Sequence, residues 1–161
     1  MPCRRTLVPR DASDGKRYVS KRKQSMYPKP LLIIVSGVPG AGKTQFAKEI
    51  SIRYDLPLIS NEDIKEVIAV PLKVNTIGLS GEIGKISFGL LWRYTEEILK
   101  DGMSCIIETR FYPKESVCEI QRILDVVDTD VLEVIFEADF EVVRERYQAR
   151  NGIGHITWLL E

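Results

Sequence analysis

The stretch Gly-Val-Pro-Gly-Ala-Gly-Lys-Thr at residues 37–44 constrains the fold of this chain more than any other feature. It matches the pattern G-x-x-x-x-G-K-[ST] at every defined position. Residues 31–35 before it are all apolar, as in a strand buried on both faces, and residues 42–54 after it show helical spacing. A glycine loop between a buried strand and a helix presents backbone N–H groups to an anion. The motif therefore predicts a phosphate-binding loop.

Each residue type in this loop suits a nucleoside triphosphate. Glycines let backbone N–H groups converge on phosphate oxygens without a Cβ atom in the way. Lys43 would reach the β- and γ-phosphates, and the Thr44 hydroxyl would bind Mg²⁺. A glycine-rich turn that only caps a helix is the alternative. The residues predicted to bind the nucleotide are Gly37, Val38, Pro39, Gly40, Ala41, Gly42, Lys43, Thr44 and Gln45.

Short apolar strands alternate with helices along the rest of the chain. Strand–helix–strand units of this kind pair in parallel with right-handed crossovers, so we expect a parallel sheet covered by helices. The expected strands are residues 31–35, 58–59, 105–107 and 131–136. The expected helices are residues 42–54, one from residue 60, 83–100, 117–127 and one over 140–147. The apolar side of the helix over 83–100 is marked by Ile83, Ile86, Leu90, Tyr94 and Ile98.

The charge is unevenly distributed, although the formal net charge is zero. Residues 1–30 hold nine Lys or Arg and two Asp or Glu, which predicts a basic, disordered leader. Met26, just before the first strand, is an alternative start of the protein. Residues 31–161 hold fourteen Lys or Arg and twenty-one Asp or Glu. This acidic balance argues against a broad nucleic-acid-binding surface and leaves at most a nucleic-acid end as a substrate.

The cysteine spacing and the lack of long apolar segments indicate the cellular compartment of the protein. Cys3, Cys105 and Cys118 show no metal-ligand spacing, and reduced thiols are the expected state. No stretch approaches the roughly 18 apolar residues of a membrane span. No apolar segment follows the basic residues, as one would in a secretory signal. We therefore expect a cytoplasmic protein without a membrane partner.

Four stretches together carry a family resemblance: LIIVSGVPGAGKT, LPLISNEDIKEVI, CIIETRF and FEADFEVVRERYQAR. They resemble the small P-loop kinases of the zeta-toxin, polynucleotide-kinase and chloramphenicol-phosphotransferase group, many of which are described as AAA-family ATPases. The resemblance implies a three-layer α/β/α sandwich with a nucleoside-kinase-like parallel sheet. It also implies transfer of the γ-phosphate of ATP, with Mg²⁺, to a hydroxyl of a small molecule or a nucleic-acid end.

The acceptor side is predicted at the stretch that follows the second strand. Ser60 and Asp63 have the spacing of a capping box. A structural role in the helix cap thus accounts for the acid at Asp63, whereas Glu62 has no part in the cap and is available for catalysis. In the resembling kinases an acid at this point accepts the proton of the acceptor hydroxyl, and a basic residue lies three positions later. Glu62, three residues before Lys65, takes that register, and Asp63 is the second choice. The alternative is that both acids only complement the helix dipole.

An acid and an arginine end the third strand. Glu108 stands where an acid can hold Mg²⁺ through water, so we predict it, with Thr44, as a metal site. It could instead contact the acceptor or simply end the strand. Arg110 follows two residues later and could face the same crevice.

Two arginines suggest a lid over the phosphates. Arg146 and Arg150 are four residues apart, so they share one helix face. Such a pair suits γ-phosphate charge during transfer. Ion pairs with neighbouring glutamates are the alternative. His155 is expected to be a loop residue.

The chain ends at Glu161, soon after this lid. Members of the resembling group continue through another helix and a final strand, which we expect to be missing from beside the central strand. Two functions therefore stay open: an ATP-dependent kinase with an alcohol acceptor, and a nucleotide-binding module without turnover. We treat residues 31–161 as one kinase-like domain that is short at its C-terminus.

Overall fold

The computed structural model describes residues 29–72, 77–139 and 141–143. Strands and helices alternate in them as the sequence predicts. The bounds are β1 (Leu31–Gly37), α1 (Lys43–Tyr54), β2 (Leu58–Ser60), α2 (Asn61–Leu72), α3 (Ile77–Lys100), β3 (Cys105–Glu108), α4 (Pro113–Leu124) and β4 (Asp130–Phe136). The third expected helix begins earlier, at Ile77, and the fourth is shifted to Pro113–Leu124 from the expected 117–127. The fifth, expected over 140–147, is described only at 141–143.

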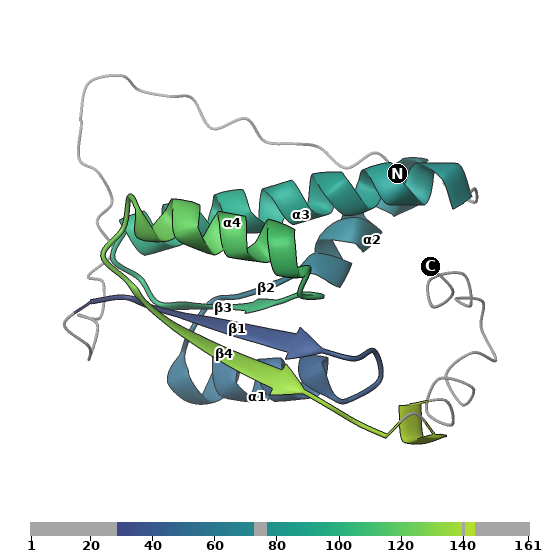
Figure 1. Cartoon of the computed structure of the whole chain (residues 1–161), viewed down its shortest axis with the longest axis horizontal. Coiled ribbons are helices and arrows are strands. Elements are labelled where there is room, and N and C mark those ends of the chain that lie inside the picture. Colours follow the sequence, from purple (N-terminus) through teal and green to yellow (C-terminus); the bar gives the residue numbers. More distant parts are fainter. Residues whose placement is uncertain (1–28, 73–76, 140, 144–161) are drawn as a thin grey trace, which may run out of the picture.

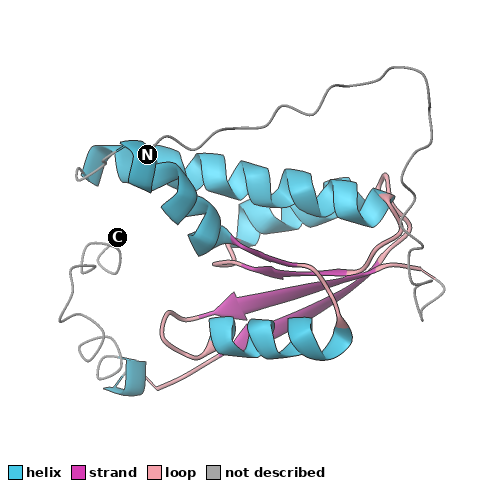
Figure 2. Ribbon diagram, turned by 180° about the vertical axis from the view of Figure 1, so that it is seen from behind, coloured by secondary structure: helices cyan, strands magenta, loops and turns pink. Residues whose placement is uncertain are grey.

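The four strands form one parallel sheet in the order β2-β3-β1-β4. Helix α1 covers one face of this sheet, and α2, α3 and α4 lie over the other face (Figures 1 and 2). The predicted three-layer α/β/α architecture is therefore confirmed. Because the strands are parallel, their carboxyl ends meet at one edge, and the glycine loop and the start of α2 both lie there.

Each sheet face has its own apolar core. Successive side chains of a strand point to opposite faces. Leu32 and Ile34 thus pack with Trp92 of α3, whereas Ile33 and Val35 pack with Ala47 of α1. This double burial explains why β1 reads as a continuous apolar run rather than an alternating one.

The buried side of α3 agrees only in part with the predicted one. Ile86 and Tyr94 are 52% and 57% exposed, and Leu91, Thr95 and Leu99 are buried instead. Polar residues can occupy this side because each has a partner within reach. The hydroxyl of Thr95 donates to the Leu91 carbonyl oxygen at 2.8 Å. Of the predicted positions, Ile83 is buried and Ile98 packs against the core, so the spacing predicted the helix correctly and its buried side in part.

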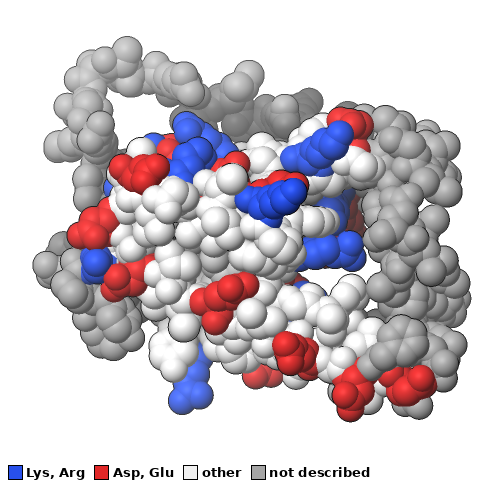
Figure 3. Space-filling view, viewed as in Figure 1, with Lys and Arg blue, Asp and Glu red and all other residues white. Residues whose placement is uncertain are grey.

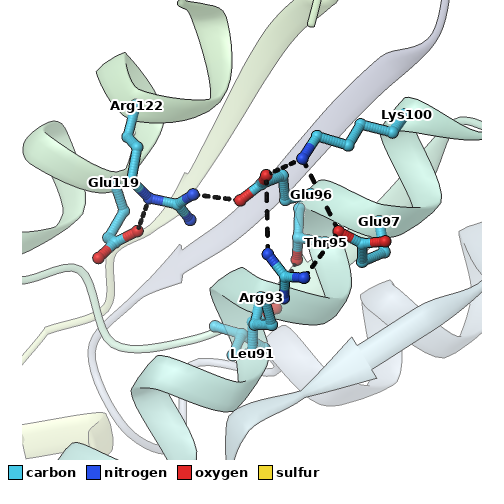
Figure 4. A network of polar contacts seen from close by, with 8 residues as sticks. All are labelled: Leu91, Arg93, Thr95, Glu96, Glu97, Lys100, Glu119 and Arg122. Atoms are coloured by element: carbon cyan, nitrogen blue, oxygen red, sulfur yellow. Dashed lines mark hydrogen bonds and ion pairs between the residues drawn. The ribbon is translucent and has the colours of Figure 1, made fainter. Parts of the chain in front are cut away.

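Glu96 is the charged residue on that buried side, and it joins α3 to α4 (Figure 4). Its carboxylate accepts hydrogen bonds from Lys100 of the same helix and from Arg122 of α4. These two bonds hold the pKa of Glu96 down from 4.5 to about 2. Buried charges are tolerated when they are paired in this way, so Glu96 fixes the two helices to one another.

Strand β4 is an edge of the sheet, and the placement predicted for a final strand is wrong. The central strand β1 already has β3 on one side and β4 on the other, so no further strand fits beside it. The free edges of the described sheet belong to β2 and β4. Along β4, Leu132 and Ile135 are 48% and 61% exposed, in contrast to the buried residues of β1.

The predicted basic leader lies outside the described residues except for its last two. Lys29 forms ion pairs of 3.1 Å with Asp128 and with Asp130. The Pro30 carbonyl oxygen accepts hydrogen bonds from the Asp130 N–H and the Thr129 hydroxyl. The contacts of the domain therefore reach back to Lys29.

Candidate functional site

The glycine loop starts where two strands approach closely. Gly37 has φ of 121°, and a Cβ atom placed on it would lie 2.0 Å from the Phe136 carbonyl oxygen of β4. That same oxygen accepts a 3.1 Å hydrogen bond from the Val38 N–H. Glycine is thus required at position 37 by backbone conformation and by contact with backbone, and the loop is held to β4 at its first residue.

The loop leads into a helix whose N-terminus is open to an anion. Gly42 takes the cap position with φ of 100°, and no side chain caps α1. The first turn of α1 carries no acidic residue. Uncapped N–H groups and the positive end of the helix dipole both favour a negative charge at this point. The local structure therefore fits the phosphate site that the motif predicts.

Lys43 folds back over its own loop. Its ammonium group donates a 2.8 Å hydrogen bond to the Val38 carbonyl oxygen. Burial is the main cause of a lowered pKa of Lys43; the charges of Glu108 and Glu62 act against the shift, and that of Arg110 adds to it. Residues from the ends of β3 and β2 thus share one electrostatic environment with the loop lysine, as the sequence predicts for a common crevice.

Thr44 and Glu108 are brought together across the sheet edge. The Thr44 hydroxyl donates a 2.6 Å hydrogen bond to Glu108 Oε1. Glu108 is only 5% exposed, and its other oxygen, Oε2, is buried without a hydrogen-bond partner. A partly unsatisfied carboxylate beside a hydroxyl is an oxygen-rich donor set, which suits Mg²⁺. The residues present thus fit the predicted metal, which would complete the coordination of Glu108.

The start of α2 has the predicted cap. The Asp63 N–H donates to the Ser60 hydroxyl oxygen at 3.4 Å, the cap geometry expected from the sequence. The Glu62 carboxylate forms a 2.9 Å ion pair with Lys65 and its side chain is 73% exposed. Asp63 is also exposed. Sequence reasoning missed Asn61, which is 2% exposed and whose Oδ1 has no hydrogen-bond partner.

A hollow of about 520 Å³ opens beside the glycine loop on the outer side of α1. It contains residues predicted to bind the nucleotide and also residues farther along the helix that the prediction did not include. Its lining residues are Gly40, Gly42, Lys43, Thr44, Gln45, Lys48, Glu49 and Ile52. The hollow at the loop therefore extends along the exposed side of α1.

The predicted lid falls outside the described residues. Arg146, Arg150 and His155 are all in the segment 144–161.

On the described part of the face seen in Figure 3, Lys and Arg side chains are interspersed with Asp and Glu. Among the described residues, no helix is both long and apolar enough to cross a membrane.

Comparisons with known proteins agree with this geometry. A family model described as an AAA domain matches residues 32–157. A candidate kinase from Chloroflexus aurantiacus j-10-fl has a similar structure, with 27% identity and a TM-score of 0.74, over 77% of this chain and 68% of that one. Among curated proteins, none matches the chain.

Two more distant structures share the fold. A sugar kinase from Janibacter sp. is 19% identical, with a TM-score of 0.57, over 78% of this chain and 69% of that one. A structure of the PezAT toxin–antitoxin system of Streptococcus pneumoniae is 14% identical, with a TM-score of 0.61, over 81% of this chain and 56% of that one. The group that the four sequence stretches predicted is confirmed.

Proposed function

Because the chain belongs to the AAA domain family of P-loop proteins, we propose that it is an ATP-dependent kinase with an alcohol acceptor. The observation that carries this proposal is the 2.6 Å contact between Thr44 and Glu108. It joins the phosphate loop to the end of β3, at the sheet edge where ligands of open α/β folds bind. A loop that only capped a helix would have no use for a buried, half-satisfied carboxylate at this point.

The proposed roles follow from the groups that each residue offers. The loop N–H groups and Lys43 hold the phosphates, and Thr44 and Glu108 hold Mg²⁺, which neutralises phosphate charge when bound. On nucleotide binding, Lys43 would exchange the Val38 carbonyl oxygen for phosphate oxygens. In the transfer, the bond from the γ-phosphorus to its bridging oxygen breaks, and a bond from that phosphorus to the acceptor oxygen forms.

The acceptor proton is the task we assign to Glu62, with Asp63 as the second choice. The Glu62 charge acts on Lys43, which supports a position facing the crevice. Its carboxylate would orient the acceptor hydroxyl and take its proton. Arg146 and Arg150 remain the proposed lid, stabilising the charge on the phosphoryl group in transit. We also propose a cytoplasmic location, where ATP and reduced thiols are available.

One observation favours a second candidate, a nucleotide-binding module without turnover. Glu62 is paired with Lys65 at 2.9 Å and largely exposed, and in this candidate that pair would keep its carboxylate away from an acceptor hydroxyl. In that case the loop would bind Mg²⁺ and ATP, and no acceptor would accelerate ADP formation.

Two measurements on the full chain separate the candidates. Calorimetry measures Mg·ATP binding, and a coupled assay measures ADP release with and without a panel of hydroxyl compounds. Acceptor-stimulated ADP release is expected for the kinase. Lys43→Ala should lower kcat about 10²- to 10³-fold, as removal of other charge-stabilising groups does. Binding with no stimulation by any acceptor would support the second candidate, and wild-type turnover in Lys43→Ala would refute the loop assignment.

A further inference from the structure

Asn61 is a buried polar residue at the sheet edge that the roles proposed above do not use. It is the first residue of α2 and directly follows the last residue of β2. Its side chain is 2% exposed, and Oδ1 has no hydrogen-bond partner. Buried side-chain oxygens in native proteins nearly always have a partner, so an exception at a strand end calls for a ligand or a bound water.

The position of Asn61 relates it to the proposed transfer site. Ser60, just before it, pairs in register with Glu108 of β3. Asn61 and Glu108 therefore belong to neighbouring strand ends, and each carries one buried oxygen without a partner. Glu62, the proposed base, is the next residue. Because Mg²⁺ is proposed to take the free oxygen of Glu108, Asn61 Oδ1 is the buried acceptor atom that this edge leaves for a hydrogen-bond donor of the acceptor molecule.

We propose that Asn61 binds a second hydroxyl group of the acceptor, which makes the acceptor a polyhydroxy compound of the sugar or alditol class. This inference rests on the proposed kinase function. An amide and a hydroxyl each donate and accept, so they pair whichever way the amide is turned. A phosphate or carboxylate group only accepts, and would leave Oδ1 unsatisfied. The terminal torsion of asparagine is soft, so the amide can turn toward a bound acceptor.

The test compares sugars and alditols with their monodeoxy analogues, using the full chain and Mg·ATP. For the polyol that best stimulates ADP release, the analogue lacking the hydroxyl bound by Asn61 should have at least a tenfold lower kcat/KM. In Asn61→Leu, the polyol should fall to the level of its analogue, so that the discrimination between the two disappears. A structural role of Asn61 would instead lower both compounds equally.

Two further readouts separate binding of the acceptor from an effect on the fold. Leucine has the same branching and number of heavy atoms as asparagine and removes an unsatisfied buried oxygen, so Asn61→Leu should melt near the wild-type temperature or above it. The Kd for Mg·ATP should not change. The matched control is Thr95→Val in α3, which also replaces a buried polar group and should keep the discrimination.

If no compound stimulates ADP release, the kinase proposal fails, and the inference is then tested by equilibrium binding of the same panel with a non-hydrolysable ATP analogue. The inference would be supported, even for a protein without turnover, if the polyol binds the wild type, its monodeoxy analogue does not, and Asn61→Leu does not bind the polyol. The inference is overturned if no polyol binds. It is equally overturned if Asn61→Leu keeps the discrimination, as expected when a buried water satisfies Oδ1.

Discussion

Glu62 and Asp63 are neighbours at the start of α2, but the structure gives them different surroundings. The backbone of Asp63 is engaged in the helix cap through the Ser60 hydroxyl. The side chain of Glu62 is engaged with Lys65, and its charge is felt by Lys43. The assignment of the base to Glu62 rests on its register three residues before Lys65, and the interaction of its charge with Lys43 supports it.

The two acids can be separated by a pair of isosteric variants. Glu62→Gln should keep Mg·ATP affinity and lose transfer by about 10²- to 10⁴-fold in kcat, the range for a general base. Asp63→Asn should stay within about threefold of wild type, because the backbone N–H that makes the cap is retained. The measurement is kcat for ADP release with a stimulating acceptor. The opposite pattern would assign the base to Asp63.

At the scale of elements, α3 and α4 are joined by apolar packing of Ile123 and by one buried charged side chain. Glu96 is buried and bonded by Lys100 and Arg122, whereas Glu97 beside it is about half exposed, with ion pairs of 3.2 Å to Arg93 and 3.8 Å to Lys100. Exposed ion pairs contribute little, because water screens them. Comparing the two glutamates therefore measures how much burial increases the contribution of an ion pair to the free energy of unfolding.

We expect Glu96→Gln to lower the free energy of unfolding by about 1.5–3 kcal/mol at pH 7, the range for hydrogen bonds to charged groups. The pKa of Glu96 is about 2 in the folded protein, against an ordinary value of 4.5, so its stabilisation is fully present above pH 4.5. The loss should therefore shrink as the pH falls from 4.5 toward 2.

Urea unfolding at pH 7, 4 and 3 measures this dependence, with Glu97→Gln as the control. The control should change the unfolding free energy by less than about 1 kcal/mol at each pH. A difference between Glu96→Gln and wild type that stays constant over the whole range would show that the Glu96 charge does not stabilise the fold.

At the scale of the whole molecule, the phosphate loop is tied to three strands. It continues β1, its Val38 N–H is bonded to β4, and its Thr44 is bonded to the end of β3. A ligand that fixes this loop therefore stabilises contacts across most of the sheet. The site is formed only when the strands are paired, so a nucleotide should bind the folded chain alone.

Mg·ATP at a hundred times its Kd should raise the free energy of unfolding by about 2.7 kcal/mol. Thermal unfolding with increasing nucleotide measures the shift. Removing Mg²⁺ with a chelator should reduce it, because Thr44 and Glu108 would lose their shared ligand. A melting temperature that does not change with nucleotide concentration would contradict nucleotide binding at this loop.

Sequence alone determined the parts of this protein that depend on local chemistry. The loop glycines have positive φ and Ser60 gives the cap of α2, because backbone conformation and the cap hydrogen bond there involve residues close in the chain. The alternation of strands and helices fixed the parallel sheet in the same way, through the handedness of short connections.

Tertiary structure decided what depends on residues far apart in the chain. Only part of the buried side of α3 could be seen in its apolar spacing, because Glu96 can be buried only with a partner, Arg122, that the fold supplies from α4. The exposure of β4 follows from its place at the sheet edge rather than from its composition. Likewise, Asn61 reads as an ordinary polar residue at the start of a helix, and only its burial without a partner marks it as a candidate for binding.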